Sequence, residues 1–164
     1  QQGGNWVILG DPTEGALLSL AGKGNIQKES LEASMPRVGE IPFSSERKRM
    51  SVISQNSLMG NGSENAHYQS PYLMFTKGSP ELILERCSTY QVGDRTERLT
   101  PALRTQILEQ NNQMAGKGLR VLGFSYKPLD AQPPEDIDDN AEQELVWLGL
   151  VGMLDAPRPE VREA

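Results

Sequence analysis

The chain has 164 residues, a length that fits one domain with a hydrophobic core of its own. Its 37% hydrophobic and 23% charged residues are typical of a soluble globular protein, and no stretch reaches the about 18 apolar residues of a membrane-spanning helix. The single cysteine, Cys87, excludes an internal disulfide and is expected to be a small buried hydrophobe rather than a reactive thiol. The start at Gln1, with neither an initiator methionine nor a signal peptide, favours a fragment of a longer protein.

The net charge of −6 is concentrated in residues 128–144. This segment holds seven acidic residues, three prolines and no basic residue, which is typical of a solvated loop. A metal site is the alternative interpretation, but the segment lacks the spacing and the glycine of a calcium-binding EF-hand loop. The seven acids are Asp130, Glu135, Asp136, Asp138, Asp139, Glu142 and Glu144.

The N-terminal third predicts a strand, a helix and two further strands. Residues 5–10 form an apolar strand pattern, and residues 11–24 form a helix that is entered through Asp11-Pro12-Thr13. Residues 35–43 and 49–55 are then predicted to be two strands that a short turn connects.

The middle of the chain continues with a polar loop over 56–71 and a strand over 72–77. A short helix over 79–87 follows, with Ser79 as its N-cap and a proline at its first position. Residues 88–92 are predicted to form the next strand.

The last third predicts a helix over 100–118 and two strands over 119–127 and 144–154. Neither the pair 36–42 and 49–55 nor the final pair of strands is connected by a helix, which favours antiparallel pairing. We therefore expect an α+β fold: a largely antiparallel, twisted sheet of about six to seven strands, flanked by helices.

Lys77 stands where a strand stops and a helix starts. A cation at such a turn can hold an anion, and the free N–H groups of the first helical turn add to the attraction. The surrounding sequence is not a phosphate-binding P-loop, because the residues before Lys77 are "LMFT" without the required glycine. An ordinary lysine at a strand end remains the alternative.

Phe43 follows a strand that Pro42 ends, and a basic cluster of Arg47, Lys48 and Arg49 comes directly after it. An aromatic ring at a loop edge beside cations suits a purine nucleotide, whose base stacks while its phosphates meet the charges. A core phenylalanine is the alternative. Glu14 lies in a first helical turn, where its charge could equally serve only to stabilise the helix.

Five segments carry a resemblance to a known family. In chain order they are "GDPTEGALL", "FSSERKRMSVI", "FTKGSPE", "GLRVLGFSYK" and "LDAPRPEV". Together they resemble the nucleotide-binding domain of type II P-type ATPases, in particular bacterial and cyanobacterial calcium-pump-like members, over residues 5–163. The resemblance implies a single domain over residues 1–164 that binds ATP or ADP and is inserted into the phosphorylation domain of a membrane pump.

The resemblance also implies roles for individual residues. Phe43 resembles the aromatic that stacks on adenine, Lys77 the lysine of the family's Lys-Gly-Ala-Pro-Glu motif, which lines the adenine pocket, and Glu14 the acid on the adenine side. Ser79 replaces the alanine of that motif. The full set of implied nucleotide-contacting residues is Glu14, Phe43, Lys48, Lys77, Gly78, Arg120 and Leu122.

Of these, Gly78 is implied to allow a close approach and Lys48 to reach toward the base and the phosphates. Arg120 is implied to contact the phosphates, and Leu122 to form a hydrophobic wall. Residues 154–163 resemble the hinge back to the phosphorylation domain and include Asp155 and Arg158. This hinge departs from the family's Asp-Pro-Pro-Arg at Ala156.

The sequence lacks the Asp-Lys-Thr-Gly-Thr segment that carries the family's phosphorylated aspartate. We therefore expect no catalytic residue and no metal site here, and no ATP hydrolysis by this fragment, with Mg²⁺ required only by the whole pump. The implied partners are the phosphorylation and actuator domains, on the cytoplasmic side of a membrane, and neither a nucleic acid nor a second copy of the chain.

Calcium is the expected transported ion, with sodium, potassium or proton open. A stand-alone nucleotide-binding module and a lipid-binding role for residues 47–49 are the alternatives.

Overall fold

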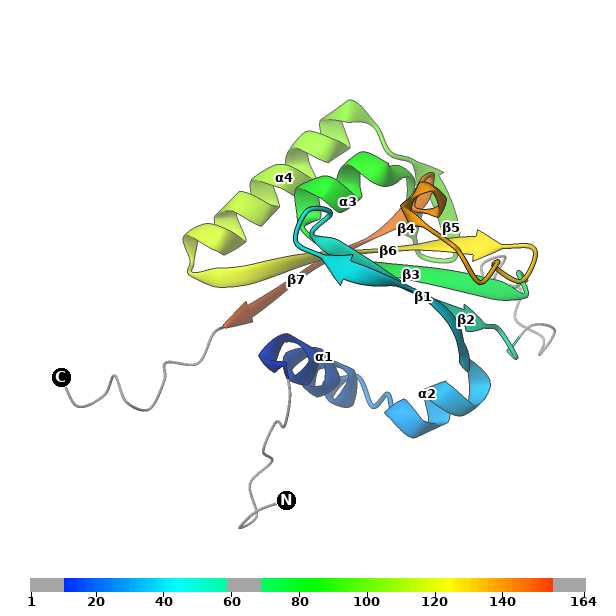
Figure 1. Ribbon diagram of the computed structural model, residues 1–164. Helices are drawn as coiled ribbons and strands as arrows, with labels where there is room; N and C mark the ends of the chain where they lie inside the picture. The colour runs from blue at the N-terminus through cyan, green and yellow to red at the C-terminus, as the bar shows by residue number, and fades with distance from the viewer. Residues whose placement is uncertain (1–10, 59–68, 155–164) are drawn as a thin grey trace, which may run out of the picture.

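The computed structural model describes residues 11–58 and 69–154. The strand predicted over residues 5–10, and the hinge residues Asp155 and Arg158, lie outside the described residues. Figure 1 shows one sheet with α3 and α4 on one face and with α1 and α2 beneath the opposite face.

The sheet has seven strands in the order β1-β2-β3-β6-β7-β4-β5. Neighbouring strands pair antiparallel except β4 and β7, which pair parallel. This confirms the α+β class and the largely antiparallel sheet. The strands are β1 (Arg37–Ser44), β2 (Arg49–Gln55), β3 (Tyr72–Gly78), β4 (Cys87–Val92), β5 (Arg95–Arg98), β6 (Leu119–Leu129) and β7 (Leu145–Leu154).

Three of the helices begin with a proline at their first position. Proline is tolerated there because the N–H that it lacks would have no acceptor within the helix. Asp11 and Thr100 cap two of them, their side chains accepting hydrogen bonds from Thr13 N and Leu103 N. Ser79 occupies the N-cap position of the third, but its hydroxyl donates to the carboxylate of Glu81 and accepts no hydrogen bond from the helix backbone. The helices are α1 (Pro12–Lys23), α2 (Lys28–Ser34), α3 (Pro80–Arg86), α4 (Pro101–Gly116) and the short 3₁₀ helix η2 (Asp139–Ala141).

The main core lies between the sheet and the α3–α4 layer. Ile53, Met74, Ile83 and Leu145 are each fully buried in it. Cys87 is also buried, as expected, and its thiol donates to the carbonyl oxygen of Ile83 at 3.2 Å. Burial raises the pKa of this thiol from 9.0 to about 12, so it stays protonated at neutral pH.

The opposite face of the sheet is covered only in part. Helix α1 buries Gly15 alone among its residues, and α2 buries none. The cleft described below lies on this side of the sheet. Within residues 11–58 and 69–154, no helix combines the length and the apolar character that crossing a membrane requires.

Candidate functional site

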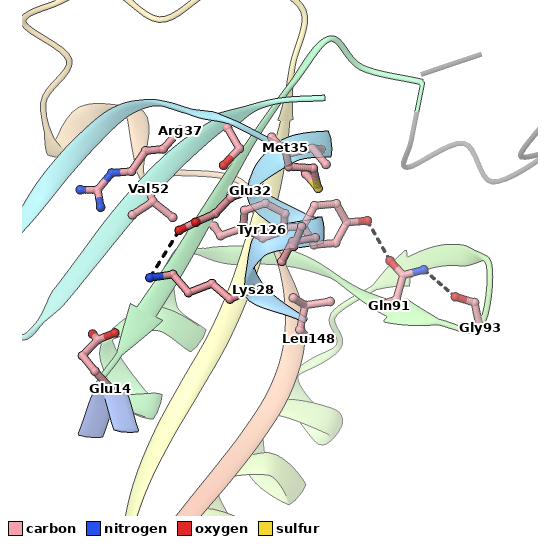
Figure 2. Close-up of a pocket in the computed structure, with 14 residues that line it drawn as sticks. Glu14, Lys28, Glu32, Met35, Arg37, Val52, Gln91, Gly93, Tyr126 and Leu148 are labelled. Carbon is pink, nitrogen blue, oxygen red and sulfur yellow. Dashed lines mark hydrogen bonds and ion pairs between the residues drawn. The ribbon is translucent and has the colours of Figure 1, made fainter. Parts of the chain in front are cut away.

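Two adjoining cavities form one cleft between the α1–α2 segment and the open face of the sheet. Their volumes are about 360 Å³ and about 810 Å³, within the roughly 300–1,000 Å³ range of small-molecule sites. Both are lined by Glu14, Arg37, Val52 and Phe75, so they are two parts of the same depression. Figure 2 shows the larger cavity, with Glu14 at one end and Gln91 at the other.

The smaller cavity is built on one row of the sheet. Met50, Lys77 and Phe124 are direct cross-strand partners on β2, β3 and β6, so their side chains share one face. Lys77 Nζ forms an ion pair with Glu14 Oε1, which connects this row to the first turn of α1. The structure therefore brings Lys77 and Glu14 together at the wall of a cavity.

Phe43 lies within β1, as the predicted strand over 35–43 has it, and Pro42 does not end the strand. Ile41 pairs with Ser51 and Ser44 with Arg49, so Pro42 and Phe43 together oppose Met50 alone. This is a β-bulge, which turns a side chain out of the regular alternation.

The Phe43 side chain is 60% exposed, which rules out the alternative of a core phenylalanine. It does not line either cavity. It lies two strands from Lys77, a separation of roughly 10 Å at the usual strand spacing.

Lys48 and Gly78 meet where the β1–β2 turn contacts the end of β3. Lys48 is exposed and has a φ of 50°, and its carbonyl oxygen accepts a hydrogen bond from Ser79 N at 2.9 Å. A Cβ on Gly78 would collide with that carbonyl oxygen and would lie 2.6 Å from the Cα of Arg49. The group that approaches Gly78 closely is thus the backbone of this turn.

Arg120 and Leu122 lie on β6, four and two residues before Phe124, and so on the same face of the sheet. Arg120 Nη1 donates to Thr13 Oγ1 at 3.4 Å, beside Glu14 in the first turn of α1. Glu14, Lys77 and Arg120 are therefore neighbours across the α1–sheet boundary, whereas Phe43 lies on the edge strand β1.

The basic cluster at residues 47–49 is not an open anion-binding surface. Arg49 is 3% exposed, and its Nε donates to Glu142 at 2.6 Å. Arg47 Nη1 donates to the same carboxylate oxygen at 2.9 Å, and of the three bases only Lys48 is exposed. The shared buried partner of its two arginines leaves Lys48 as the exposed cation of this cluster, which disfavours the lipid-binding alternative.

Glu142 also corrects the prediction that residues 128–144 are a solvated loop. Its side chain has no solvent exposure, and Ser51 Oγ donates to its second oxygen at 2.7 Å. The other six acids of the segment are exposed or half-buried. Among the described residues, His, Cys, Asp and Glu side chains do not gather in a group of three or more that could hold a metal ion.

Comparison with known proteins decides the family. The family model described as "P-type ATPase, cytoplasmic domain N" matches residues 1–160. The chain belongs to this family. Three relatives, each a longer P-type or cation-transporting ATPase, show how much of this chain is similar to them.

Calcium-transporting ATPase 1 of Bacillus cereus is 38% identical over 156 residues, which are 94% of this chain and 16% of that protein. Cation-transporting ATPase pma1 of Synechocystis sp. is 35% identical over 97% of this chain and 16% of its own length. Sodium/potassium exporting P-type ATPase cta3 of Schizosaccharomyces pombe is 37% identical over 98% of this chain and 14% of its own. This N domain thus spans about a sixth of the relatives it matches.

Sequence reasoning missed several residues that line the cleft of this N domain. Arg37 borders both cavities, and Met50 and Phe124 form the row with Lys77. Met50 and Phe124 are apolar residues in strands, which the sequence does not distinguish from core residues. The alternation along β2 and β6 would assign them to one face, but only the position of α1 makes that face part of a cleft.

Proposed function

We propose that this chain binds ATP in the α1–sheet cleft, as the nucleotide-binding domain of a cation-transporting P-type ATPase. The observation that carries the proposal is the Lys77–Glu14 pair at the wall of a 360 Å³ cavity, in the same row of the sheet as the exposed Phe43. Family membership supports it independently.

The adenine base stacks on the ring of Phe43, and its exocyclic amino group donates to the carboxylate of Glu14. Stacking of a base on an aromatic side chain contributes about 1–3 kcal/mol. Met50 and Phe124 supply the apolar floor, and Leu122 extends it along β6. A carboxylate accepts hydrogen bonds but repels phosphate, so Glu14 favours the base end of the nucleotide at α1.

Lys48 and Arg120 provide the positive charge for the phosphates, whereas Lys77 lines the base end of the site beside Glu14. Lys48 and Arg120 are exposed, so their contacts are screened by solvent and each adds little affinity. Lys77 must share its charge between Glu14 and the nucleotide. The expected Kd is on the order of 0.1–1 mM, which corresponds to about −4 to −5.5 kcal/mol.

The bound nucleotide serves a reaction that this chain does not complete. Phosphoryl transfer requires an in-line acceptor and electrostatic clamping of the transferred group, usually through Mg²⁺. The acceptor aspartate and the metal ligands belong to the phosphorylation domain of the same pump, to which residues 154–163 return the chain. The whole pump holds this domain on the cytoplasmic side of its membrane.

Calcium is the proposed cargo, because the relatives of this chain include a calcium-transporting ATPase at 38% identity. A relative named for sodium and potassium export is 37% identical, so identity in the N domain does not by itself distinguish the transported cation. Sodium, potassium and proton remain alternatives for the whole protein.

Acylation of lysines with and without ATP tests the proposed site. ATP should protect Lys77, and to a lesser degree Lys48, from an amine-reactive label, while the exposed Lys117 at the end of α4 serves as the control. Peptide mass spectrometry quantifies each site. Equal labelling of Lys77 with and without 5 mM ATP would refute the proposed site.

A further inference from the structure

We propose that Arg47, anchored on the buried carboxylate of Glu142, is the positioning residue that holds Phe43 in place as the base platform. The proposal rests on the proposed nucleotide binding and adds a device that controls its affinity. Neither residue touches the base. They act through the backbone of the bulge that presents the ring.

Arg47 spans the distance between Glu142 and the bulge. Its Nη1 donates to Glu142 Oε2 at 2.9 Å, while its Nη2 donates to the carbonyl oxygen of Pro42. That carbonyl belongs to the peptide bond that leads directly into Phe43. One planar guanidinium thus links a fixed buried charge to the backbone beside the exposed ring, with both donors held in a rigid fork.

The turn that carries Arg47 is itself fixed from two sides. Arg47 N donates to Ser44 Oγ at 3.1 Å, and Lys48 N donates to the carbonyl oxygen of Ser44 at 2.7 Å. These bonds close the turn between β1 and β2. The backbone of Arg47 is therefore held in place, and the guanidinium reaches Glu142 and the Pro42 carbonyl from this fixed turn.

Glu142 is a firm anchor because its carboxylate is surrounded by donors. Arg49 Nε and Arg47 Nη1 share Oε2, and Ser51 Oγ donates to Oε1 at 2.7 Å. Ser51 Oγ lies 2.7 Å from Thr76 Oγ1, next to Lys77 in β3. One buried carboxylate consequently ties the Phe43 bulge to the strand that carries Lys77.

Such a link has a function only if the platform would otherwise move. β1 is an edge strand, and Phe43 sits in its bulge with 60% of its side chain exposed. Few packing contacts hold such a ring, so ordering it on binding would cost affinity. Arg47 removes part of this cost by fixing the peptide before the ring in the free protein.

The test replaces Arg47 by methionine, which keeps the length of the side chain and removes both donors. Arg95→Met is the matched control: Arg95 also pairs with a glutamate, Glu97, at 2.8 Å, but on β5 at the opposite edge of the sheet. Arg47→Met should weaken ATP and adenosine by the same factor, of about 5 or more, whereas Arg95→Met should leave both affinities unchanged. In a Phe43→Ala background, Arg47→Met should have no further effect.

The outcomes separate the possible roles of Arg47. Weaker ATP binding with unchanged adenosine binding would mean that Arg47 contacts a phosphate, and would overturn the proposal. Equal affinities for wild type and Arg47→Met would also overturn it. If the wild type binds no nucleotide, the proposed function fails, and the base-platform role with it.

A relaxation measurement tests the link to the bulge without a nucleotide. The backbone order parameter of Phe43 should fall from the rigid value of about 0.85 toward 0.6 in Arg47→Met. Arg47→Lys, which has one donor group in place of the fork, should give an intermediate value, and it replaces the methionine variant if that variant does not fold. An unchanged order parameter in a folded variant would refute the positioning role.

Discussion

The Nε of Arg49 lies 2.6 Å from the carboxylate of Glu142, although 93 positions separate the two residues in the chain. Both side chains are almost fully withdrawn from solvent, at 3% and 0% exposure. A buried ion pair adds little net stability, since desolvation offsets most of the attraction, but removing one partner leaves a charge without compensation. The pair therefore fixes the β1–β2 turn against the 128–144 segment more than it strengthens the fold.

Replacement of Glu142 by alanine should lower the free energy of unfolding by about 3–5 kcal/mol, because two arginines lose their shared counter-charge. Urea denaturation measures the change. Glu135→Ala is the control, an exposed acid of the same segment whose loss should change stability by no more than about 0.5 kcal/mol. Equal effects of the two variants would contradict the structural role of Glu142.

Phe43→Ala should weaken ATP binding by about 1–3 kcal/mol, or roughly 5- to 150-fold, because the base loses its stacking partner. Stability should fall by less than about 1 kcal/mol, since the ring is 60% exposed. Val38→Ala, on the same strand and 39% exposed, is the matched control for affinity. Calorimetric ATP titration and a thermal melt on each variant decide the matter; an unfolded Phe43→Ala protein would show that the ring has a packing role instead.

Gly78→Ala should destabilise the chain by about 1–3 kcal/mol, because the added methyl group collides with the backbone of Lys48 and Arg49. The same change at Gly22 in α1 meets no atom within 4 Å and should stabilise the protein by up to about 1 kcal/mol through helix propensity. Denaturant midpoints of the two variants should move in opposite directions. A neutral Gly78→Ala would mean that the turn does not need this close approach.

The sequence predicted the elements that local chemistry marks. Proline after Asp11, Ser79 and Thr100 located the starts of α1, α3 and α4, and apolar runs located the longer strands. It missed α2, which buries no residue and lacks a side-chain cap, and β5, whose four polar residues pair with β4 across a hairpin. Short polar elements of this kind form through contacts with neighbouring elements, and their sequences show little of the hydrophobic periodicity from which helices and strands are predicted.

The candidate site likewise contains residues that the sequence pointed to and residues that it did not. Lys77 and Glu14 drew attention by their places at a strand end and a helix start, the family resemblance implied their nucleotide role, and the structure joins them in an ion pair. The burial of Glu142 was not predictable, because an acid within a run of acids and prolines is ordinarily solvated. Its partners are 91 and more positions away, and only the folded sheet brings them together.

Cys87 should resist thiol reagents in the folded protein at pH 8 and react fully after denaturation, because burial raises its pKa to about 12. The shift also predicts a pH dependence. The unfolded thiol loses its proton from about pH 9 upward while the folded thiol keeps it, so stability should decline between pH 9 and 12.

Colorimetric thiol titration with and without guanidinium measures the reactivity, and the stability difference between wild type and Cys87→Ala should shrink above pH 9. Rapid labelling of the native protein would show that the thiol is accessible.

The most direct test of nucleotide binding is an ATP titration of the ¹⁵N-labelled chain followed by its amide spectrum. We expect saturable shifts at Glu14, Phe43 and Lys77, with one common Kd on the order of 0.1–1 mM. Amides of β5, at the opposite edge of the sheet from β1, should stay in place. ADP should bind within several-fold of ATP, without release of phosphate. A spectrum that does not change at 5 mM ATP, or shifts confined to residues outside the cleft, would contradict the account.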